Sequence, residues 1–223
     1  MFFARLAFEL SRLTPRLYEQ ALNRYFNELT MDKSNGYENI AKDFIEVRGK
    51  SVNGIGASSV RDWVKELSYG SVVLDLGCGT GIPVSKILIE EGMTVYGIDA
   101  SPTLISTFQQ NFPNTPVACE SVEESKFFNL RFDAIVAWGL IFLLPGEVQA
   151  IVIQKVANSL LIGSRFLFTA PCEKVEWKDA MTGQNSKSLG GEAYRELISS
   201  SGLFLIEEFE DEGENHYFST VKF

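Results

Sequence analysis

The chain has 223 residues, of which 45% are hydrophobic and 22% are charged, a composition typical of a folded domain rather than a disordered chain. Its 29 acidic residues outnumber its 20 basic ones and give a formal net charge of −9, which disfavours nucleic acid and anionic membrane surfaces as partners. The longest uncharged apolar run, Ala134–Gly146, is too short to span a bilayer. Three dispersed cysteines and one histidine argue against a disulfide framework, a zinc knuckle and a His-rich metal site. We therefore expect a cytoplasmic protein without a bound metal.

The first 33 residues predict a helical extension. Apolar residues recur there three and four positions apart, as on one face of a helix, at Phe3, Leu6, Leu10, Leu13 and Leu17. Thr14-Pro15 has the pattern of a helix start, so two short helices are expected. Charges interrupt every apolar stretch, unlike a signal peptide. This extension would pack on the body, on a partner or in a homodimer, and residues 34–223 would form one domain.

Strands and helices alternate along that domain. Helices are expected at Gly36–Phe44, Ser58–Leu67, Pro83–Glu91, Ser101–Asn111, Glu147–Leu161 and Glu192–Ser200. Strands are expected at Val72–Leu76, Thr94–Ile98, Pro116–Cys119, Ala134–Trp138, Arg165–Ala170, Leu203–Phe209 and His216–Phe223. The alternation predicts an α/β fold with a doubly wound, Rossmann-like sheet of seven strands. Only Glu210–Asn215 separates the last two strands, too little for a crossover, so the last strand should be antiparallel. Cys172–Gly190 is predicted to be a polar loop.

A glycine-rich turn at the end of the first strand is the most informative segment. Val73–Gly81 reads Val-Leu-Asp-Leu-Gly-Cys-Gly-Thr-Gly, and its glycines allow a tight turn and a close approach of a ligand to main-chain N–H groups. Asp99 ends the next strand, where a carboxylate can accept both hydroxyls of a ribose. The segment therefore predicts a site for a nucleoside cofactor.

The glycine spacing distinguishes between cofactors. A dinucleotide fingerprint needs a third glycine where this chain has Ile82 or Val84, depending on the starting glycine. Asp75 also directs a carboxylate toward the turn, which would repel a pyrophosphate and suit a positively charged ligand. A nicotinamide-dependent oxidoreductase stays an alternative, but with an incomplete fingerprint.

These residues resemble the class I S-adenosylmethionine-dependent methyltransferases that act on small molecules. Val73–Gly81 matches their first motif, Asp99 their ribose-binding acid and Phe132–Val136 their fourth-strand motif, and the resemblance covers about residues 34–223. It implies S-adenosylmethionine as the cofactor, with adenine contacts after the third strand and an N-terminal cap from which Arg48 would pair with the methionine carboxylate. The cofactor-binding residues it implies are Tyr37, Arg48, Asp75, Gly77, Cys78, Gly79, Gly81, Asp99, Ala100, Ser121, Val122 and Trp138. A core role for Tyr37 and Trp138 and a surface role for Arg48 stay open.

The acceptor is less determined. Ligands bind at the carboxyl ends of parallel strands, which brings Trp138, Pro171–Glu173 and the loop Glu210–Asn215 to one edge. His216, in sequence beside Asp211 and Glu214, is a candidate catalytic base; a surface histidine in an acidic turn is the alternative. The acidic edge favours a cationic small molecule such as an amine. A non-catalytic S-adenosylmethionine-binding protein is a further alternative.

Overall fold

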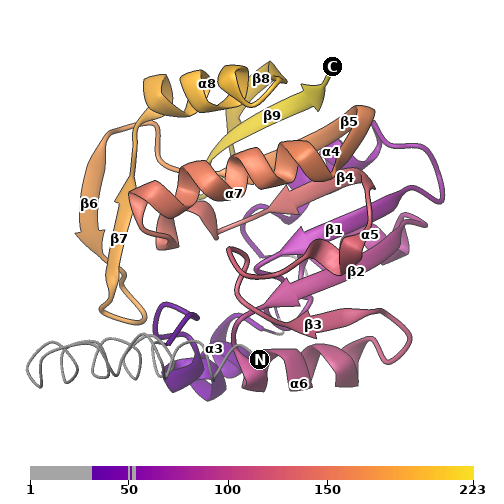
Figure 1. Ribbon diagram of the computed structural model, residues 1–223. Helices are drawn as coiled ribbons and strands as arrows, with labels where there is room; N and C mark the ends of the chain where they lie inside the picture. The colour runs from indigo at the N-terminus through magenta and orange to yellow at the C-terminus, as the bar shows by residue number, and fades with distance from the viewer. Residues whose placement is uncertain (1–31, 50, 52–53) are drawn as a thin grey trace, which may run out of the picture. The chain divides into compact units, whose positions relative to one another are not determined.

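The computed structural model describes residues 32–49, 51 and 54–223 (Figure 1). The predicted helical extension and its homodimer contact fall on residues 1–31, outside the described residues, and stay predictions. The chain divides into two compact units, Met1–Asp32 and Lys33–Phe223, and the sheet and its helices belong to the second. In the described residues no helix is both long enough and apolar enough to cross a membrane.

A seven-stranded sheet forms the centre of this unit, with the strand order β3-β2-β1-β4-β5-β9-β8 among the residues described. Its strands are β1 (Val72–Leu76), β2 (Thr94–Asp99), β3 (Val117–Cys119), β4 (Phe132–Ala137), β5 (Leu160–Thr169), β8 (Leu203–Glu210) and β9 (His216–Lys222). Strands β1 to β5 pair in parallel, whereas β9 runs antiparallel between β5 and β8. The predicted seven-stranded α/β sheet with an antiparallel last strand is therefore confirmed.

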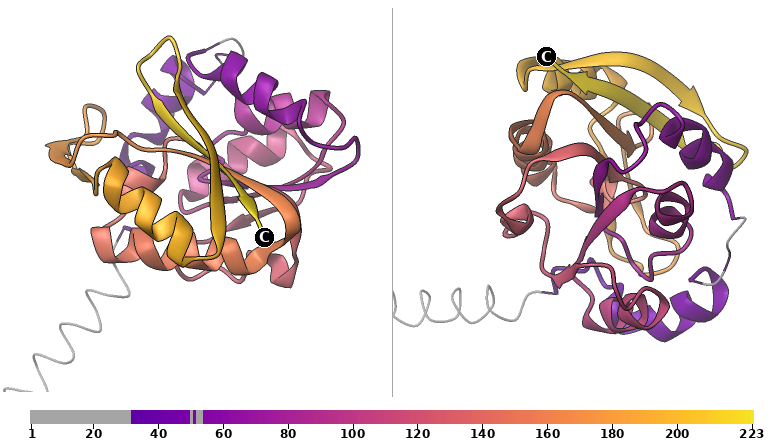
Figure 2. Two further views of the ribbon diagram at one scale, coloured as in Figure 1. Left: turned by 90° about the horizontal axis from the view of Figure 1, so that it is seen from above. Right: turned by 90° about the vertical axis from the view of Figure 1, so that its right-hand side faces the viewer.

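Helices cover both faces of the sheet (Figure 2). They are η1 (Glu38–Ile40), α3 (Ala41–Val47), α4 (Ala57–Val64), α5 (Val84–Glu90), α6 (Pro102–Asn111), η2 (Phe127–Asn129), η3 (Ile141–Leu143), α7 (Gly146–Ser159) and α8 (Gly191–Ser200). Helices α7 and α8 bury Val152 and Ile198 against Phe166 and Phe168 of β5. Helices α4 and α5 pack on the other face. The parallel strands are thus buried on both sides, which explains their nearly continuous apolar sequences.

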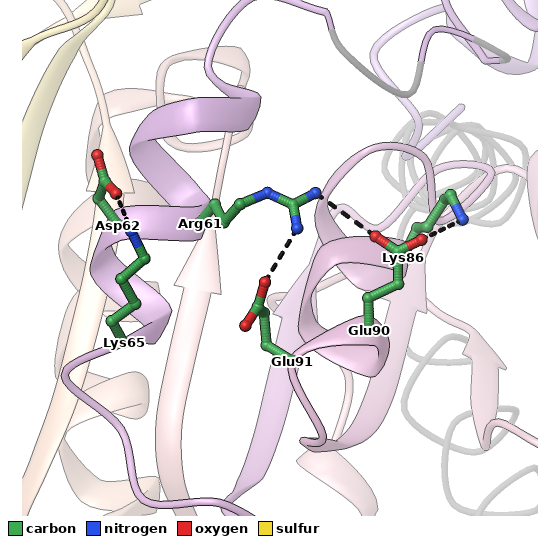
Figure 3. A network of polar contacts seen from close by, with 6 residues as sticks. All are labelled: Arg61, Asp62, Lys65, Lys86, Glu90 and Glu91. Atoms are coloured by element: carbon green, nitrogen blue, oxygen red, sulfur yellow. Dashed lines mark hydrogen bonds and ion pairs between the residues drawn. The ribbon is translucent and has the colours of Figure 1, made fainter.

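A polar network joins the outer surfaces of α4 and α5 (Figure 3). Arg61 binds Glu91 at 2.9 Å and Glu90 at 3.5 Å, and Lys86 also pairs with Glu90. Exposed ion pairs of this kind contribute at most about 1 kcal/mol each. The apolar contacts beneath them, which include Val60 and Leu88, therefore carry most of the packing energy between these helices and the sheet.

The segment Cys172–Gly190 corrects the sequence prediction. It is not only a loop: β6 (Val175–Lys178) and β7 (Asn185–Ser188) form an antiparallel hairpin beside the main sheet (Figure 1). Trp177 of β6 packs on Phe142 of η3, with ring centroids 5.5 Å apart. The two strands are short and polar, so their sequences show too little alternation of apolar and polar residues to predict a hairpin.

One helix boundary also differs from the prediction. Helix α7 ends at Ser159, and β5 begins at Leu160 rather than at Arg165. Leu161 and Ile162 are exposed. Their apolar side chains therefore do not continue the buried face of α7, although the sequence suggested that the helix extends to Leu161.

Candidate functional site

The glycine-rich turn joins β1 to α5. Its three glycines have left-handed φ angles, 72° at Gly77, 53° at Gly79 and 80° at Gly81, a region that side chains with a Cβ rarely adopt. The N–H groups of Gly77 and Cys78 both donate to the carbonyl of Ile98 in β2, at 2.8 and 3.0 Å. A Cβ added at Gly81 would lie 2.5 Å from the ring of Phe112. The turn is therefore fixed by the neighbouring strand, and it has no room for a larger residue at Gly81.

Asp99, at the end of β2, lies against this turn. Its carboxylate accepts hydrogen bonds from the N–H of Gly79 at 2.9 Å and from the N–H of Ser101 at 2.8 Å, one on each oxygen. Each carboxylate oxygen can accept a second hydrogen bond, so two acceptor positions remain for a ligand. Ala100 and Asp99 are both partly exposed. The side chain is thus held in one orientation with acceptor capacity for a pair of hydroxyls.

Asp75 lies beneath the turn rather than on its open side. The residue is 2% exposed, and its carboxylate accepts a hydrogen bond of 2.6 Å from Ser85 Oγ in the first turn of α5. Burial raises the pKa of Asp75 to about 7. Cys78 is also buried, with its sulfur against Gly97 of β2. Both side chains therefore shape the turn from within.

The loop after β3 carries Ser121 and Val122, which are both buried. Lys155 of α7 reaches across to this loop and donates to the carbonyls of Val122, at 2.8 Å, and Glu123, at 3.3 Å. Its ammonium also lies 4.3 Å from the centroid of the Phe127 ring. Among the described residues, the hydroxyl of Ser121 finds no hydrogen-bond partner. An unpaired buried hydroxyl of this kind fits a loop that completes its contacts with a ligand.

Residues 37 to 49 cover the glycine-rich turn. Glu38 accepts hydrogen bonds from Ser101 Oγ, from Thr103 Oγ1 at 2.6 Å and from the Thr103 N–H at 3.1 Å, which holds this segment on the first turn of α6. A Cβ added at Gly79 would lie 3.8 Å from Phe44. Thr80 Oγ1 donates to the carbonyl of Gly49 at 3.0 Å. Residues 37 to 49 therefore lie over the glycine-rich turn, where the family resemblance implied an N-terminal cap.

Tyr37 and Arg48 occupy different positions in this cap. The Tyr37 ring meets Phe44 edge-on, with centroids 5.6 Å apart, and burial together with the nearby Asp179 raises the pKa of Tyr37 to about 12. Arg48 ends α3 and is exposed. Tyr37 is therefore held within the cap, whereas Arg48 would have to turn inward to reach a ligand.

Carboxylates give the turn a negative environment. Burial raises the pKa of Asp99, and the charge of Glu38 raises it further. In the same way, the charge of Asp99 adds to the effect of burial on the pKa of Asp75. The carboxylates of Asp99 and Glu38 beside the glycine turn would repel the pyrophosphate of a dinucleotide and attract a cation such as a sulfonium. The electrostatics therefore favour S-adenosylmethionine over a nicotinamide nucleotide.

Comparison with known proteins supports this assignment. Residues 73–163 match the family model described as a methyltransferase domain. Residues 73–163 belong to a methyltransferase domain. Its glycine turn, its Asp99 and its sheet with an antiparallel strand beside β5 are those that the family resemblance implied, and S-adenosylmethionine is the cofactor of this domain type.

Individual relatives agree with this domain assignment. An uncharacterised methyltransferase of Synechocystis is 32% identical over 87 residues, which is 39% of this chain and 41% of that protein; the chain thus spans less than half the length of that curated relative. The CcbJ methyltransferase from Streptomyces caelestis superposes with a TM-score of 0.70 at 16% identity, covering 86% of this chain and 99% of that one. The glycopeptide N-methyltransferase MtfA superposes with a TM-score of 0.61 at 17% identity, covering 75% and 96%. These structural likenesses show the fold of the methyltransferase domain.

Trp138 follows β4 in the methyltransferase domain and is tied to the β8–β9 loop. Its indole Nε1 donates to Tyr217 Oη at 2.7 Å, and Tyr217 donates in turn to Asp211 Oδ2 at 2.8 Å. Asp211 is held by Asn215 as well. A Cβ added at Gly56 would lie 2.6 Å from Tyr217 Oη. Trp138 therefore contacts the loop Glu210–Asn215 through Tyr217, and these hydrogen bonds fix the orientation of the indole. The sequence predicted both segments at the same edge of the sheet.

His216 has neighbours that its position in the sequence does not predict. Its Nε2 lies 2.8 Å from Glu208 Oε2 and its Nδ1 lies 3.5 Å from Glu210 Oε1, so its acidic neighbours are these rather than Asp211 and Glu214. Side chains alternate along a strand: Tyr217 belongs to the α4–α5 face, and His216 packs with Phe218 on the α7–α8 face. The role of catalytic base for His216 stays a prediction.

Proposed function

We propose that the chain transfers the methyl group of S-adenosylmethionine to a small-molecule acceptor by direct in-line displacement. The observation that carries the proposal is the covered glycine turn beside Asp99. A second cover closes toward the cap from the β6–β7 hairpin, because a Cβ added at Gly36 would lie 2.9 Å from Gln184 and 3.1 Å from Thr182. A site enclosed by two such covers suits a small acceptor better than a nucleic acid duplex.

The residues of the turn and of the strand ends would hold the cofactor. Asp99 would accept the ribose hydroxyls, the backbone at Gly77 and Gly79 would lie against the cofactor, and Ser121 and Val122 would line the adenine. Arg48 would pair with the methionine carboxylate. The bound cofactor supplies an electrophilic methyl group on a sulfonium. The carboxylates around the turn favour its positive charge in the ground state.

An amine is the acceptor class that we propose. The chain carries a net charge of −9. Asp99 ends β2, and Glu173 and Asp211 follow the carboxyl ends of β5 and β8, so these carboxylates would attract a cationic acceptor. The glycopeptide N-methyltransferase shares the fold and adds support for this class. Methyl transfer requires chiefly that the nucleophile is aligned with the sulfonium and freed of water, and a primary ammonium must also lose a proton first.

The test is the release of S-adenosylhomocysteine by the full chain against amines, phenols, carboxylates, thiols and a basic peptide. We expect turnover with amines, and loss of it in Asp99→Ala with a rise in the dissociation constant for S-adenosylmethionine of more than about tenfold. Asp62→Ala is the matched control, since Asp62 is an exposed carboxylate of α4. Unchanged affinity in Asp99→Ala would contradict the ribose assignment. Cofactor binding without any turnover would favour the non-catalytic alternative, and turnover with another class would replace the amine.

A further inference from the structure

A cluster of three metal-binding residue types lies where β5 ends and β8 and β9 meet. Cys172 follows β5 by three residues, Glu208 belongs to β8 and His216 begins β9. One ligand atom of each residue lies within 4.8 Å of the corresponding atoms of the other two. Because β9 runs between β5 and β8, the sheet order brings Cys172 close to Glu208 and His216, which lie far from it in sequence.

We propose that Cys172, Glu208 and His216 bind a divalent transition-metal ion of the zinc type. A thiolate, an imidazole and a carboxylate are all ligands that zinc accepts, and the sulfur and nitrogen donors select against magnesium and calcium. The three ligand atoms lie within 4.8 Å of one another, and His216 Nε2 lies 2.8 Å from Glu208 Oε2. Zinc bonds are about 2.0 to 2.3 Å long, so two ligand atoms of a tetrahedral zinc ion lie about 3.3 to 3.8 Å apart. The side chains of His216 and Glu208 would therefore separate slightly to admit the ion.

The protein environment fits a metal site. The side chains of His216 and Glu208 are only 13% and 17% exposed, so much of the water that would compete for an ion is excluded. Nδ1 of His216 is buried, and its contact with Glu210 Oε1, at 3.5 Å, is too long for a good hydrogen bond. Cys172 is partly exposed, which provides an entry route. Three protein ligands would leave a fourth coordination position open.

Arg195 of α8 neutralises the cluster when no metal is present. Its Nε and one terminal nitrogen bind the two oxygens of Glu208 at 2.6 and 2.8 Å, and a Cβ added at Gly191 would lie 2.7 Å from Cys172 Sγ and 3.3 Å from the Arg195 guanidinium. The Arg195 side chain is 48% exposed, so it can turn into solvent. A metal ion would take the place of Arg195 beside Glu208, so Arg195 and the metal should compete for this carboxylate. Removal of the Arg195 charge should therefore strengthen metal binding, whereas removal of a ligand should weaken it.

The experiment is a calorimetric titration of the chelator-treated full chain with Zn²⁺, followed by an absorption spectrum with Co²⁺. We expect one Zn²⁺ per chain and a thiolate-to-cobalt charge-transfer band. Cys172→Ser should abolish the band, and Cys172→Ser and His216→Gln should each weaken zinc binding by at least about tenfold. Cys119→Ser is the matched control, because Cys119 is an exposed thiol outside the cluster, and it should leave both signals unchanged. Arg195→Gln should bind zinc more tightly than the unaltered chain.

Three results would overturn the proposal. The first is the absence of saturable zinc binding in the unaltered chain. The second is equal zinc affinity in Cys172→Ser, His216→Gln and the unaltered chain, which would place the bound metal elsewhere. The third is weaker zinc binding in Arg195→Gln. Thermal unfolding of each variant without metal establishes that the variant is folded, and Glu208→Gln provides a further ligand variant if one of the others is not.

Discussion

Glu38 and Thr103 are joined by two hydrogen bonds, from the Thr103 hydroxyl and from its backbone N–H, although 65 residues separate them in the chain. The contact places a carboxylate on the first turn of α6, where the exposed N–H groups of a helix favour negative charge. It also fastens the N-terminal cap beside Asp99, so the cap and the proposed ribose site are mechanically linked.

Removing this contact should weaken both the cap and cofactor binding. We expect Glu38→Ala to lower the free energy of unfolding by about 0.5 to 2 kcal/mol, as for a lost helix cap, and to raise the dissociation constant for S-adenosylmethionine about threefold to tenfold. Denaturant unfolding and calorimetry measure the two effects. Glu46→Ala, at an exposed position of α3, should change neither. A stable Glu38→Ala protein with unchanged affinity would show that the cap does not depend on this contact.

The buried Asp75 should make stability depend on pH. Its pKa is raised from 3.8 to about 7 in the folded chain, so the folded state holds this proton more tightly than the unfolded state. The stabilisation is complete below about pH 4 and is lost as the pH rises to about 7, at about 1.4 kcal/mol for each unit of raised pKa. Asp75→Asn should remove this dependence.

Urea unfolding at several pH values between about 4 and 8 measures that effect. An asparagine side chain in place of Asp75 can still accept the hydrogen bond from Ser85, and Asp62→Asn provides an exposed control for the same change of charge. Parallel stability profiles for Asp75→Asn and the unaltered chain would mean that Asp75 titrates normally.

The Trp138–Tyr217 hydrogen bond should be important to the β8–β9 loop. Tyr217→Phe leaves the partly buried indole N–H and Asp211 without their shared partner, which should cost about 1 kcal/mol of the free energy of unfolding. The matched control is Tyr69→Phe, since Tyr69 is 88% exposed and its hydroxyl is free to meet water. Equal stability of the two variants would show that water replaces the lost hydroxyl.

Lys155 is expected to position the loop proposed to line the adenine. Lys155→Met keeps the apolar stem over Phe127 but removes the donors to the carbonyls of Val122 and Glu123, and should weaken binding of S-adenosylmethionine about threefold to tenfold. Adenosine should lose affinity by the same factor, because the effect is confined to the nucleoside end. Lys126→Met, at an exposed position of the same loop, is the control. A loss for S-adenosylmethionine without one for adenosine would contradict this role.

The sequence was a good guide where a residue's structure depends on its immediate neighbours. The alternation of strands and helices predicted the parallel sheet, and the short connection before β9 predicted its antiparallel last strand. The three glycines of the turn and the acid at the end of β2 predicted a nucleoside cofactor, which the family resemblance then named. Ser101 and Pro102 likewise begin α6 as expected, with Ser101 Oγ accepting from the N–H of Leu104.

Contacts between distant segments were not predictable in this way. Glu38, Lys155 and Glu208 carry no motif, and their partners lie far along the chain or on another strand, so only the folded sheet reveals them. The partners of His216 depend on the face of β9 to which its side chain belongs. Proximity in sequence pointed instead to Asp211 and Glu214. The β6–β7 hairpin is stabilised by a tertiary contact, the packing of Trp177 on Phe142, and its own polar sequence gives no indication of that contact.

The place of β9 in the sheet has a consequence for biosynthesis. This strand follows every other strand in the sequence, yet it lies between β5 and β8. Without this strand, β5 and β8 would lie in the chain with no strand to join them. A chain whose synthesis stops after Asn215 would therefore expose unpaired strand edges, which favour aggregation.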